Sequence, residues 1–549
     1  MEMGLQSGEP SSSIAEAKRG IWSSLREIQR RANRLYTGEM PGFHVEHFGC
    51  RAARADGEAV SGWLLAAGHC VQQPSEADVV VVNTCSVTAE ADRAARAFIR
   101  RAHRLNPAAR IVVTGCYAQR APEELAGLAG VAAVVGNSHK AFAPRIALSL
   151  MGHSVPHTST AAPQAGGGFI QIQPASAPPQ VVWADDRFAH SFLEETQLVP
   201  GAQTRPNLKI QEGCGNRCTF CVIPQTRGSS RSLPAAAVLK QVAGLVAAGG
   251  NELVLSGINL GRWGRDLSDS HDPDPNADPD QLSVRTLAHL VQRIFDETEL
   301  KRLRLSSIEP MDWDGELIGL MAEFGGTRLA RHVHLPLQSG SDAVLRRMHR
   351  RYRPWHYEEK VWALVKAAGP ELTLGADVMV GFPGETGSEF EQTLELVRKL
   401  PFGYLHLFPF SPRPGTRGWA LHSERPVAGQ AVAERMAELR TLAAEKSRAH
   451  RRSFVGRELE AITLHTPMEL ESAGRTSVLT ENFLPVELEG RLAANRLVRL
   501  QVTGLNVDGT LSAVTDAAER TQNAATATSV LPKSVPLKSS SSPVSLASA

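Results

Sequence analysis

Three cysteines on one short loop constrain this chain more than any other feature. They are spaced as Cys214-x3-Cys218-x2-Cys221 and follow Leu208–Gln211, which is predicted to be a buried strand. Three thiolates so close together can bind three irons of a [4Fe–4S] cube and leave the fourth iron open. A structural zinc site would need a fourth protein ligand, and no nearby Cys or His is well placed to supply one. The spacing therefore favours an iron–sulfur cluster over zinc.

A second group of cysteines is spread over the N-terminal part of the chain. Cys50, Cys85 and Cys116 each follow a predicted strand, and these strands are Phe43–Gly49, Asp78–Thr84 and Arg110–Gly115. Because the carboxyl ends of parallel strands share one edge of a sheet, the three thiols can converge. The alternative is that these three cysteines are buried in the core simply as small hydrophobic side chains. Their equivalent positions favour a second cluster, whereas Cys70 has no such position and is predicted to be a structural or free thiol.

The order of predicted strands and helices indicates an α/β protein in several domains. Residues 42–150 alternate strands with helices such as Ala89–Leu105, which predicts an open parallel α/β sheet. Residues 206–445 repeat strand–helix units and predict a partial or full α/β barrel. Its expected strands are Leu208–Gln211, Glu252–Ser256, Arg302–Ser307, His332–Leu335, Gly375–Val380 and Tyr404–Phe408. Short alternating strands over residues 453–515 predict a small β-barrel.

The remaining segments have compositions typical of extensions, linkers, loops and tails. Residues 1–41 form an extension in which Ile14–Leu35 could be a basic amphipathic helix, read as a solvated helix rather than a binding element. Residues 151–205 are rich in Pro, Ala, Gly, Ser and Gln, which predicts a linker or insertion. Asp266–Asp280 is expected to be a surface loop, and residues 516–549 a disordered tail.

Composition narrows the choice of partner and compartment. The 549 residues carry a formal net charge of only +2, so a nucleic-acid site would have to come from local patches. No apolar run approaches the roughly 18 residues of a membrane span, and the N-terminus lacks the pattern of a secretory signal. Seven cysteines, an odd number, point toward metal binding rather than a disulfide framework. We expect a cytoplasmic protein that does not enter a membrane.

The segment around the first cysteine group resembles a known family. KIQEGCGNRCTFCVIPQTRGSSRS, which contains Cys214, Cys218 and Cys221, is similar to the radical S-adenosylmethionine core of the methylthiotransferases. The resemblance implies that the open iron binds the methionine part of S-adenosylmethionine. Reduction of the cluster would then cleave the cofactor to a 5′-deoxyadenosyl radical. The three cysteines would thus be both metal ligands and catalytic residues.

Later stretches resemble the parts of this family that surround the cofactor. They are LSGINLG, RLSSIEP, HLPLQSGSD and DVMVGFPGE, each at a predicted strand end. Taken singly each is weak, because a glycine after a strand is usually a turn and a polar strand end is usually solvated. Their order and spacing make the resemblance specific. It implies cofactor contacts from Gly257, Asn259, Ser306, Glu309, Gln338 and Asp377.

The N-terminal cysteines also fit the family. The resemblance implies that Cys50, Cys85 and Cys116 hold an auxiliary [4Fe–4S] cluster whose open iron carries the sulfur to be inserted. The family usually has Lys or Gln after the first cysteine and Asn two residues later, as in CKVNQ. Here the chain reads Cys50-Arg-Ala-Ala-Arg-Ala-Asp56, so we expect different hydrogen bonding around this cluster.

Residues 453–515 resemble the TRAM domain, a small β-barrel that binds tRNA in related enzymes. For any single arginine of this module, the alternative is an ordinary solvated side chain. The resemblance implies phosphate contacts, for which the candidates are Arg457, Arg475, Arg496 and Arg499.

Two short stretches predict the substrate. Asn83-Thr-Cys85-Ser-Val-Thr88 and Leu305-Ser-Ser-Ile-Glu309-Pro310 resemble the methylthiotransferases that act on threonylcarbamoyladenosine at position 37 of tRNA. The alternatives are the isopentenyladenosine enzymes, the ribosomal-protein aspartate enzymes, and a non-catalytic iron–sulfur protein that binds RNA.

The reaction that the resemblance implies methylates sulfur at the auxiliary cluster, and the radical then removes hydrogen from carbon 2 of the adenine. It requires tRNA, a sulfur source and an external electron donor of the flavodoxin or ferredoxin type.

Overall fold

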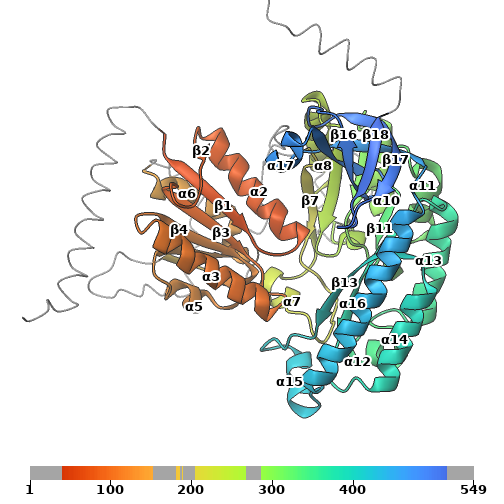
Figure 1. Cartoon of the computed structure of the whole chain (residues 1–549). Helices are drawn as coiled ribbons and strands as arrows, with labels where there is room; N and C mark the ends of the chain where they lie inside the picture. Colours follow the sequence, from red (N-terminus) through yellow and green to blue (C-terminus); the bar gives the residue numbers. More distant parts are fainter. Residues whose placement is uncertain (1–39, 153–180, 186–187, 189–203, 268–285, 516–549) are drawn as a thin grey trace, which may run out of the picture. The chain divides into compact units, whose positions relative to one another are not determined.

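The computed structural model describes residues 40–152, 181–185, 188, 204–267 and 286–515 (Figure 1). The chain forms two compact units. One contains the described residues up to Ser453 together with Glu481–Phe483, and the other contains Phe454–Thr480 and the described residues from Leu484 onward. The predicted helix Ile14–Leu35 and the tail 516–549 lie outside the described residues, as do most of residues 151–205 and of the loop Asp266–Asp280.

The first unit begins with the predicted parallel α/β sheet. Its strand order is β2-β1-β3-β4-β5-β6, and all neighbours are parallel. The strands are β1 (Gly42–His47), β2 (Cys70–Val71), β3 (Val79–Thr84), β4 (Arg110–Gly115), β5 (Val131–Gly136) and β6 (Val181–Trp183). β3 is buried along its whole length, as its run of valines predicts for a strand covered on both faces. β6 lies within the segment that composition predicted to be a linker.

Helices cover both faces of this sheet. On one face, α3 (Ala89–Leu105), α4 (Cys116–Arg120) and α5 (Pro122–Ala126) pack on alternate residues of β3 and β4. On the other, α2 (Arg51–Ala66) and α6 (Ala143–Leu150) pack on the residues between them. The carboxyl ends of the strands therefore lie along one edge of the sheet, and the three N-terminal cysteines follow the ends of β1, β3 and β4.

The rest of the first unit is a partial barrel built from two sheets. One has the order β10-β9-β7-β8, and the other has the order β11-β12-β13. The strands are β7 (Asn207–Glu212), β8 (Arg231–Ser232), β9 (Glu252–Gly257), β10 (Arg302–Leu305), β11 (His332–His334), β12 (Thr373–Val380) and β13 (Phe402–Pro409). Each predicted strand is present, and the barrel is partial rather than closed.

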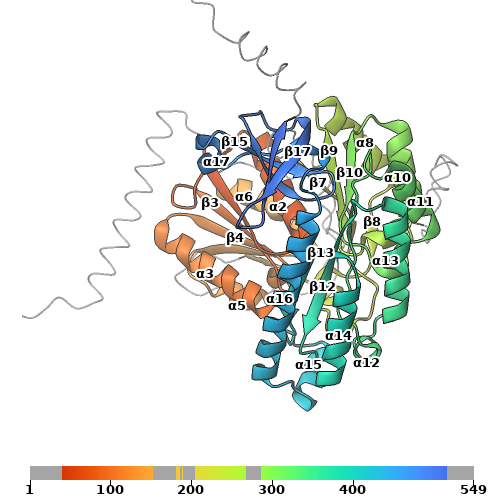
Figure 2. The same cartoon turned by 45° about the vertical axis from the view of Figure 1, so that its right-hand side comes forward.

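Amphipathic helices cover the outside of this barrel, as Figures 1 and 2 show. They include α8 (Ala235–Ala247), α10 (Leu287–Glu297), α11 (Gly315–Phe324), α13 (Pro354–Ala368), α14 (Gly387–Lys399) and α16 (Gly429–Arg452). Their buried faces join the strands in one apolar core. Among the described residues, no helix combines the length and the hydropathy that a membrane crossing requires.

The second unit is a closed five-stranded barrel of order β14-β15-β16-β18-β17. Its strands are β14 (Glu458–Thr463), β15 (Arg475–Thr480), β16 (Pro485–Glu489), β17 (Leu497–Leu505) and β18 (Leu511–Thr515). Alternate residues such as Leu459, Val486 and Val502 fill the interior, as period-2 patterning requires. The prediction of a small C-terminal β-barrel is confirmed.

Candidate active site

The loop between β7 and α7 (Ile223–Arg227) carries Cys214, Cys218 and Cys221. Each sulfur faces an N–H donor: the Asn216 amide lies 3.4 Å from Cys214 Sγ and the Ile223 amide 3.5 Å from Cys221 Sγ. Such donors stabilise thiolates. Burial nevertheless raises the pKa of Cys221 to about 12, and the neighbouring thiols raise it further. The loop can hold three thiolates only beside compensating positive charge, which fits the irons of a cluster.

Arg350 supplies a donor to the third sulfur. Its Nη1 lies 3.3 Å from Cys218 Sγ, and its Nη2 lies 2.6 Å from Glu309 Oε2. Burial would lower the pKa of Arg350, but the charges of Glu309 and Cys218 and the Tyr352 hydroxyl hold it well above its usual value. Glu309, predicted to touch the cofactor, therefore also fixes a guanidinium beside the cluster loop. Arg350 was missed because it is one of five arginines in RRMHRRYR.

Three of the predicted cofactor residues carry buried polar atoms without a hydrogen-bond partner among the described residues. These atoms are Asn259 Oδ1, Ser306 Oγ and Gln338 Oε1. Ser256 Oγ in β9, which was not predicted to touch the cofactor, is also buried without a partner among the described residues. Buried polar groups in native proteins are almost always paired. Asn259 Nδ2 lies 3.6 Å from Cys214 Sγ, so the unpaired Oδ1 of the same amide lies next to the cluster loop. The donor set fits a polar cofactor bound there.

The other two predicted cofactor residues have different surroundings. A Cβ at Gly257 would lie 2.8 Å from the Cβ of Gln211, so the close approach of β9 to β7 accounts for the glycine. Asp377 lies in β12, where its Oδ1 lies 3.1 Å from His334 Nε2 and 3.3 Å from His406 Nδ1. Although burial favours the neutral acid, these two histidines hold the pKa of Asp377 well below its usual value.

The structure also brings the N-terminal cysteines together. Cys50 precedes α2, Cys85 follows β3 and Cys116 begins α4. Burial raises the pKa of Cys85 to about 12, and the nearby thiols of Cys50 and Cys116 contribute to the rise. Gly49 has a φ of +118°, and a Cβ there would lie 2.8 Å from Cys85 Sγ. The glycine thus lets the chain pass close to Cys85, whereas Cys70 is exposed in β2.

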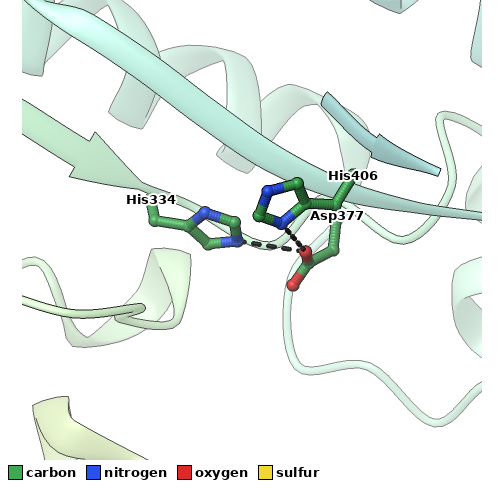
Figure 3. Close-up of side chains that lie close together, drawn as sticks. All are labelled: His334, Asp377 and His406. Carbon is green, nitrogen blue, oxygen red and sulfur yellow. Dashed lines mark ion pairs between the residues drawn. The ribbon is translucent and has the colours of Figure 1, made fainter. Parts of the chain in front are cut away.

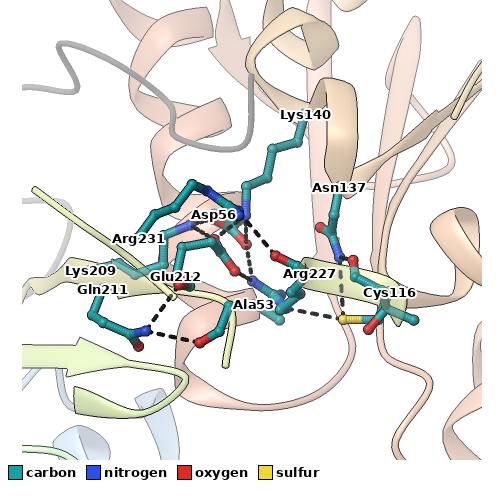
Figure 4. A network of polar contacts seen from close by, with 12 residues as sticks. Ala53, Asp56, Cys116, Asn137, Lys140, Lys209, Gln211, Glu212, Arg227 and Arg231 are labelled. Carbon is teal, nitrogen blue, oxygen red and sulfur yellow. Dashed lines mark hydrogen bonds and ion pairs between the residues drawn. The ribbon is translucent and has the colours of Figure 1, made fainter. Parts of the chain in front are cut away.

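Arg227 links this second cysteine group to the barrel. Its Nε lies 3.1 Å from Cys116 Sγ, and Asn137 Nδ2 approaches the same sulfur at 3.4 Å (Figure 4). The side chain of Arg227 is completely buried. Its Nη1 donates to Glu212 at 2.6 Å and to Asp56 at 3.2 Å. Arg227 lies six residues after Cys221 in the motif, and only its position there could have marked it.

Arg227 belongs to a buried network of five charges. Lys140 and Lys209 each pair with both Asp56 and Glu212, so three cations surround two carboxylates. Burial would raise the pKa of Glu212, but the three cations hold it well below its usual value. Burial also lowers the pKa of Lys140 to about 8. The network carries one excess positive charge, next to the sulfur of Cys116.

The predicted tRNA-binding arginines lie in the second unit. Arg475, Arg496 and Arg499 are exposed, and Arg457 is half-buried with its guanidinium 5.4 Å from the ring of Phe454. Arg475 pairs with Glu487. These side chains can reach solvent, which phosphate contacts require.

Comparison with known proteins gives matches for both the N-terminal sheet domain and the barrel. Residues 42–136 match the uncharacterized protein family UPF0004, and residues 208–397 match the radical SAM superfamily. The threonylcarbamoyladenosine tRNA methylthiotransferase MtaB of Bacillus subtilis is 34% identical over 82% of this chain and 90% of the relative. The chain belongs to the radical S-adenosylmethionine methylthiotransferase family. The resemblance seen in the sequence is confirmed.

Other methylthiotransferases are similar to nearly the same extent. MtaB of Aquifex aeolicus is 32% identical over 83% of this chain and 99% of its own length. The tRNA-2-methylthio-N(6)-dimethylallyladenosine synthase of a Parafrankia species is 34% identical over 84% of this chain and 83% of its own length. Identity alone therefore shows the family and does not separate its substrate groups.

Proposed function

We propose that this methylthiotransferase adds a methylthio group to carbon 2 of N6-threonylcarbamoyladenosine at position 37 of tRNA. The names of the Bacillus subtilis and Aquifex aeolicus relatives support this substrate. The observation that carries the proposal is the polar character of β11, β12 and β13. Neighbouring positions on these strands hold hydrogen-bonded polar side chains, namely His332, His334, Asp377, Tyr404 and His406.

These side chains suit a polar nucleoside better than an apolar one. Asp377 and His406 keep 26% and 62% of their side-chain surface exposed, so a substrate could contact them. Threonylcarbamoyl offers these side chains further hydrogen-bonding partners, whereas an isopentenyl group would remove water from Asp377 and His406 without replacing its hydrogen bonds. A site built for polar contacts rejects an analogue that lacks them much more strongly than an apolar site rejects a polar isostere.

In this proposal the two groups of cysteines hold two clusters with different tasks. We propose that Cys214, Cys218 and Cys221 hold the cluster that, when bound, supplies the electron for cleavage of S-adenosylmethionine. Asn259, Ser306 and Gln338 would orient the cofactor, and the Glu309–Arg350 pair would hold the cluster loop in place. Cys50, Cys85 and Cys116 would hold a second [4Fe–4S] cluster, with Arg227 and Asn137 donating to the sulfur of Cys116. A sulfur source and a flavodoxin-type or ferredoxin-type electron donor would complete the reaction.

Substrate choice can be tested directly with two matched tRNAs. One carries threonylcarbamoyladenosine and the other isopentenyladenosine at position 37, and both are incubated with reduced enzyme and S-adenosylmethionine. Because the polar strands favour polar contacts, we expect kcat/KM to be at least about 100-fold higher for the first. Mass spectrometry of the digested nucleosides measures both products. Equal rates, or a preference for isopentenyladenosine, would refute the proposed substrate.

Iron content tests the number of clusters. Two sites with three cysteine ligands each should give about eight irons per reconstituted chain. Alanine at Cys214, Cys218 and Cys221 should leave about four, because only the N-terminal site remains. Cys70→Ala is the matched control and should keep the full amount, since that thiol is exposed and apart from both groups. Four irons in the intact protein would contradict the second cluster.

Salt dependence of binding tests the proposed tRNA surface. Each phosphate contact contributes about 0.7–0.9 to the slope of log affinity against log salt. If all four arginines touch phosphates, changing them to Gln should reduce that slope by about 3. The variant combines Arg457→Gln, Arg475→Gln, Arg496→Gln and Arg499→Gln.

A charge-matched control removes four exposed arginines from helices of the first unit. These are Arg100, Arg101, Arg440 and Arg448. An equal loss of slope in both variants would mean that the second unit has no special part in tRNA binding. Point variants test this better than deletion from Phe454 onward, because deletion would also remove Glu481, which pairs with Arg331 inside the first unit.

A further inference from the structure

Three side chains on adjacent barrel strands form a cluster that neither predicted iron–sulfur site uses. His334 ends β11, Asp377 lies in β12 and His406 lies in β13. In the parallel register, Asp377 is the direct partner of His406, and Gly375, two residues before Asp377, is the partner of His334. Residues two apart in a strand share one face. The backbone register therefore places all three side chains on the same face of the sheet.

The three side chains converge on one point, as Figure 3 shows. His334 Nε2 lies 3.1 Å from Asp377 Oδ1, and His406 Nδ1 lies 3.3 Å from the same oxygen. The three candidate ligand atoms all lie within 4.8 Å of one another. First-row divalent ions bind imidazole nitrogen and carboxylate oxygen at about 2.0–2.2 Å, which places adjacent ligands about 3 Å apart.

We propose that His334, Asp377 and His406 bind a divalent first-row transition-metal ion, separate from the two iron–sulfur clusters. Two imidazoles and one carboxylate suit zinc or iron(II), and leave coordination positions open for water or a further ligand. The exposed side chain of His406 provides a path by which the ion can enter. The proposal does not depend on which modified nucleoside is the substrate.

Hydrogen bonds behind the cluster orient one of its ligands. His334 Nδ1 lies 3.0 Å from the Tyr404 hydroxyl, which also lies 2.8 Å from His332 Nε2. Metal-binding histidines usually hold such a partner on the second ring nitrogen, which fixes the ring and its tautomer. Tyr404 is thus placed to serve this purpose for His334.

The proton arrangement needed for metal binding is available along this chain of contacts. His332 is buried, with its Nε2 beside the Tyr404 hydroxyl. In the tautomer with its proton on Nδ1, His332 can accept the Tyr404 proton at Nε2, and Tyr404 can then accept the proton of His334 Nδ1. His334 Nε2 is left with a lone pair directed at the Asp377 carboxylate. Two such acceptors 3.1 Å apart repel each other unless a cation lies between them.

The alternative is a cluster held by hydrogen bonds alone. With the protons shifted the other way, His334 Nε2–H would donate to Asp377 and no ion would be needed. The two arrangements differ in whether the protein retains an added metal ion, and this difference can be measured without enzymatic turnover.

The test uses full-length protein with both iron–sulfur sites loaded, dialysed anaerobically against excess Zn²⁺. Zinc and iron per chain are then counted by mass spectrometry. We expect one zinc per chain in the wild type, and loss of that zinc in Asp377→Asn and in His406→Gln. Tyr404→Phe should weaken zinc binding by about 10–100-fold, the usual cost of removing a supporting hydrogen bond.

His289→Gln is the matched control, since that histidine is exposed on α10, where it pairs with Glu316. It should bind zinc as the wild type does, and unchanged iron in every variant shows that the fold is kept. His406 is exposed, so its variant keeps the test valid if Asp377→Asn does not fold. No zinc in the wild type, or equal zinc in the wild type and both ligand variants, would overturn the proposal.

Discussion

Alanine at Cys50, Cys85 and Cys116 will leave this enzyme able to cleave S-adenosylmethionine but unable to place a methylthio group on tRNA. The cysteines lie in the N-terminal sheet domain, whereas the loop expected to support cleavage lies between β7 and α7 of the barrel. Removing the N-terminal thiols spares Cys214, Cys218 and Cys221 together with their N–H donors. Formation of 5′-deoxyadenosine under reduction should continue, and methylthiolated nucleoside should fall below detection.

The reciprocal variant completes this experiment. Alanine at Cys214, Cys218 and Cys221 should abolish both activities, because no site remains for reductive cleavage. Circular dichroism and the iron of the untouched site verify that each variant is folded. Cys70→Ala serves as the control for loss of a thiol and should keep both activities. Normal tRNA methylthiolation by the Cys50/Cys85/Cys116 variant would show that the N-terminal cysteines are structural.

The positions of the cysteines could be predicted because they depend on topology. In a parallel sheet the carboxyl ends of the strands share one edge, so Cys85 and Cys116, far apart in sequence, come together once their strands are recognised. The barrel strands could be predicted because they alternate with helical segments along the chain. The helix after Cys50 was not predicted, because its sequence RAARADGEAVSGWLLA contains two glycines and few large apolar residues.

The partners of the cysteines could not be predicted in this way. Arg227 and Asn137 meet at Cys116 although they are 90 residues apart in sequence, and only the packing of the N-terminal sheet on the barrel brings them together. Strand β6 was missed for a related reason. Val181–Trp183 lies in a Pro-rich and Ala-rich segment, and it becomes a strand by pairing with the edge of β5. In both cases the structure depends on tertiary contacts, which the local sequence does not reveal.

The buried charges beside Cys116 carry the second large prediction, which concerns stability. Glu212→Gln should lower the free energy of unfolding by about 3–5 kcal/mol, the usual cost of removing one partner from a buried ion pair. The substitution leaves Lys140, Lys209 and Arg227 with Asp56 as the remaining carboxylate of the network, so the buried excess rises from one positive charge to two. Anaerobic chemical denaturation followed by circular dichroism measures the change.

Two further variants test whether charge is the cause. Glu297→Gln removes a carboxylate from an exposed ion pair with Arg293 on α10, and should cost no more than about 0.5 kcal/mol. Glu212→Gln combined with Lys140→Met returns the buried excess to a single positive charge, as in the wild type. We therefore expect the double variant to be more stable than Glu212→Gln, although it lacks one more hydrogen-bonding group. If the double variant is instead less stable, the network stabilises the protein through its individual hydrogen bonds rather than through its balance of charge.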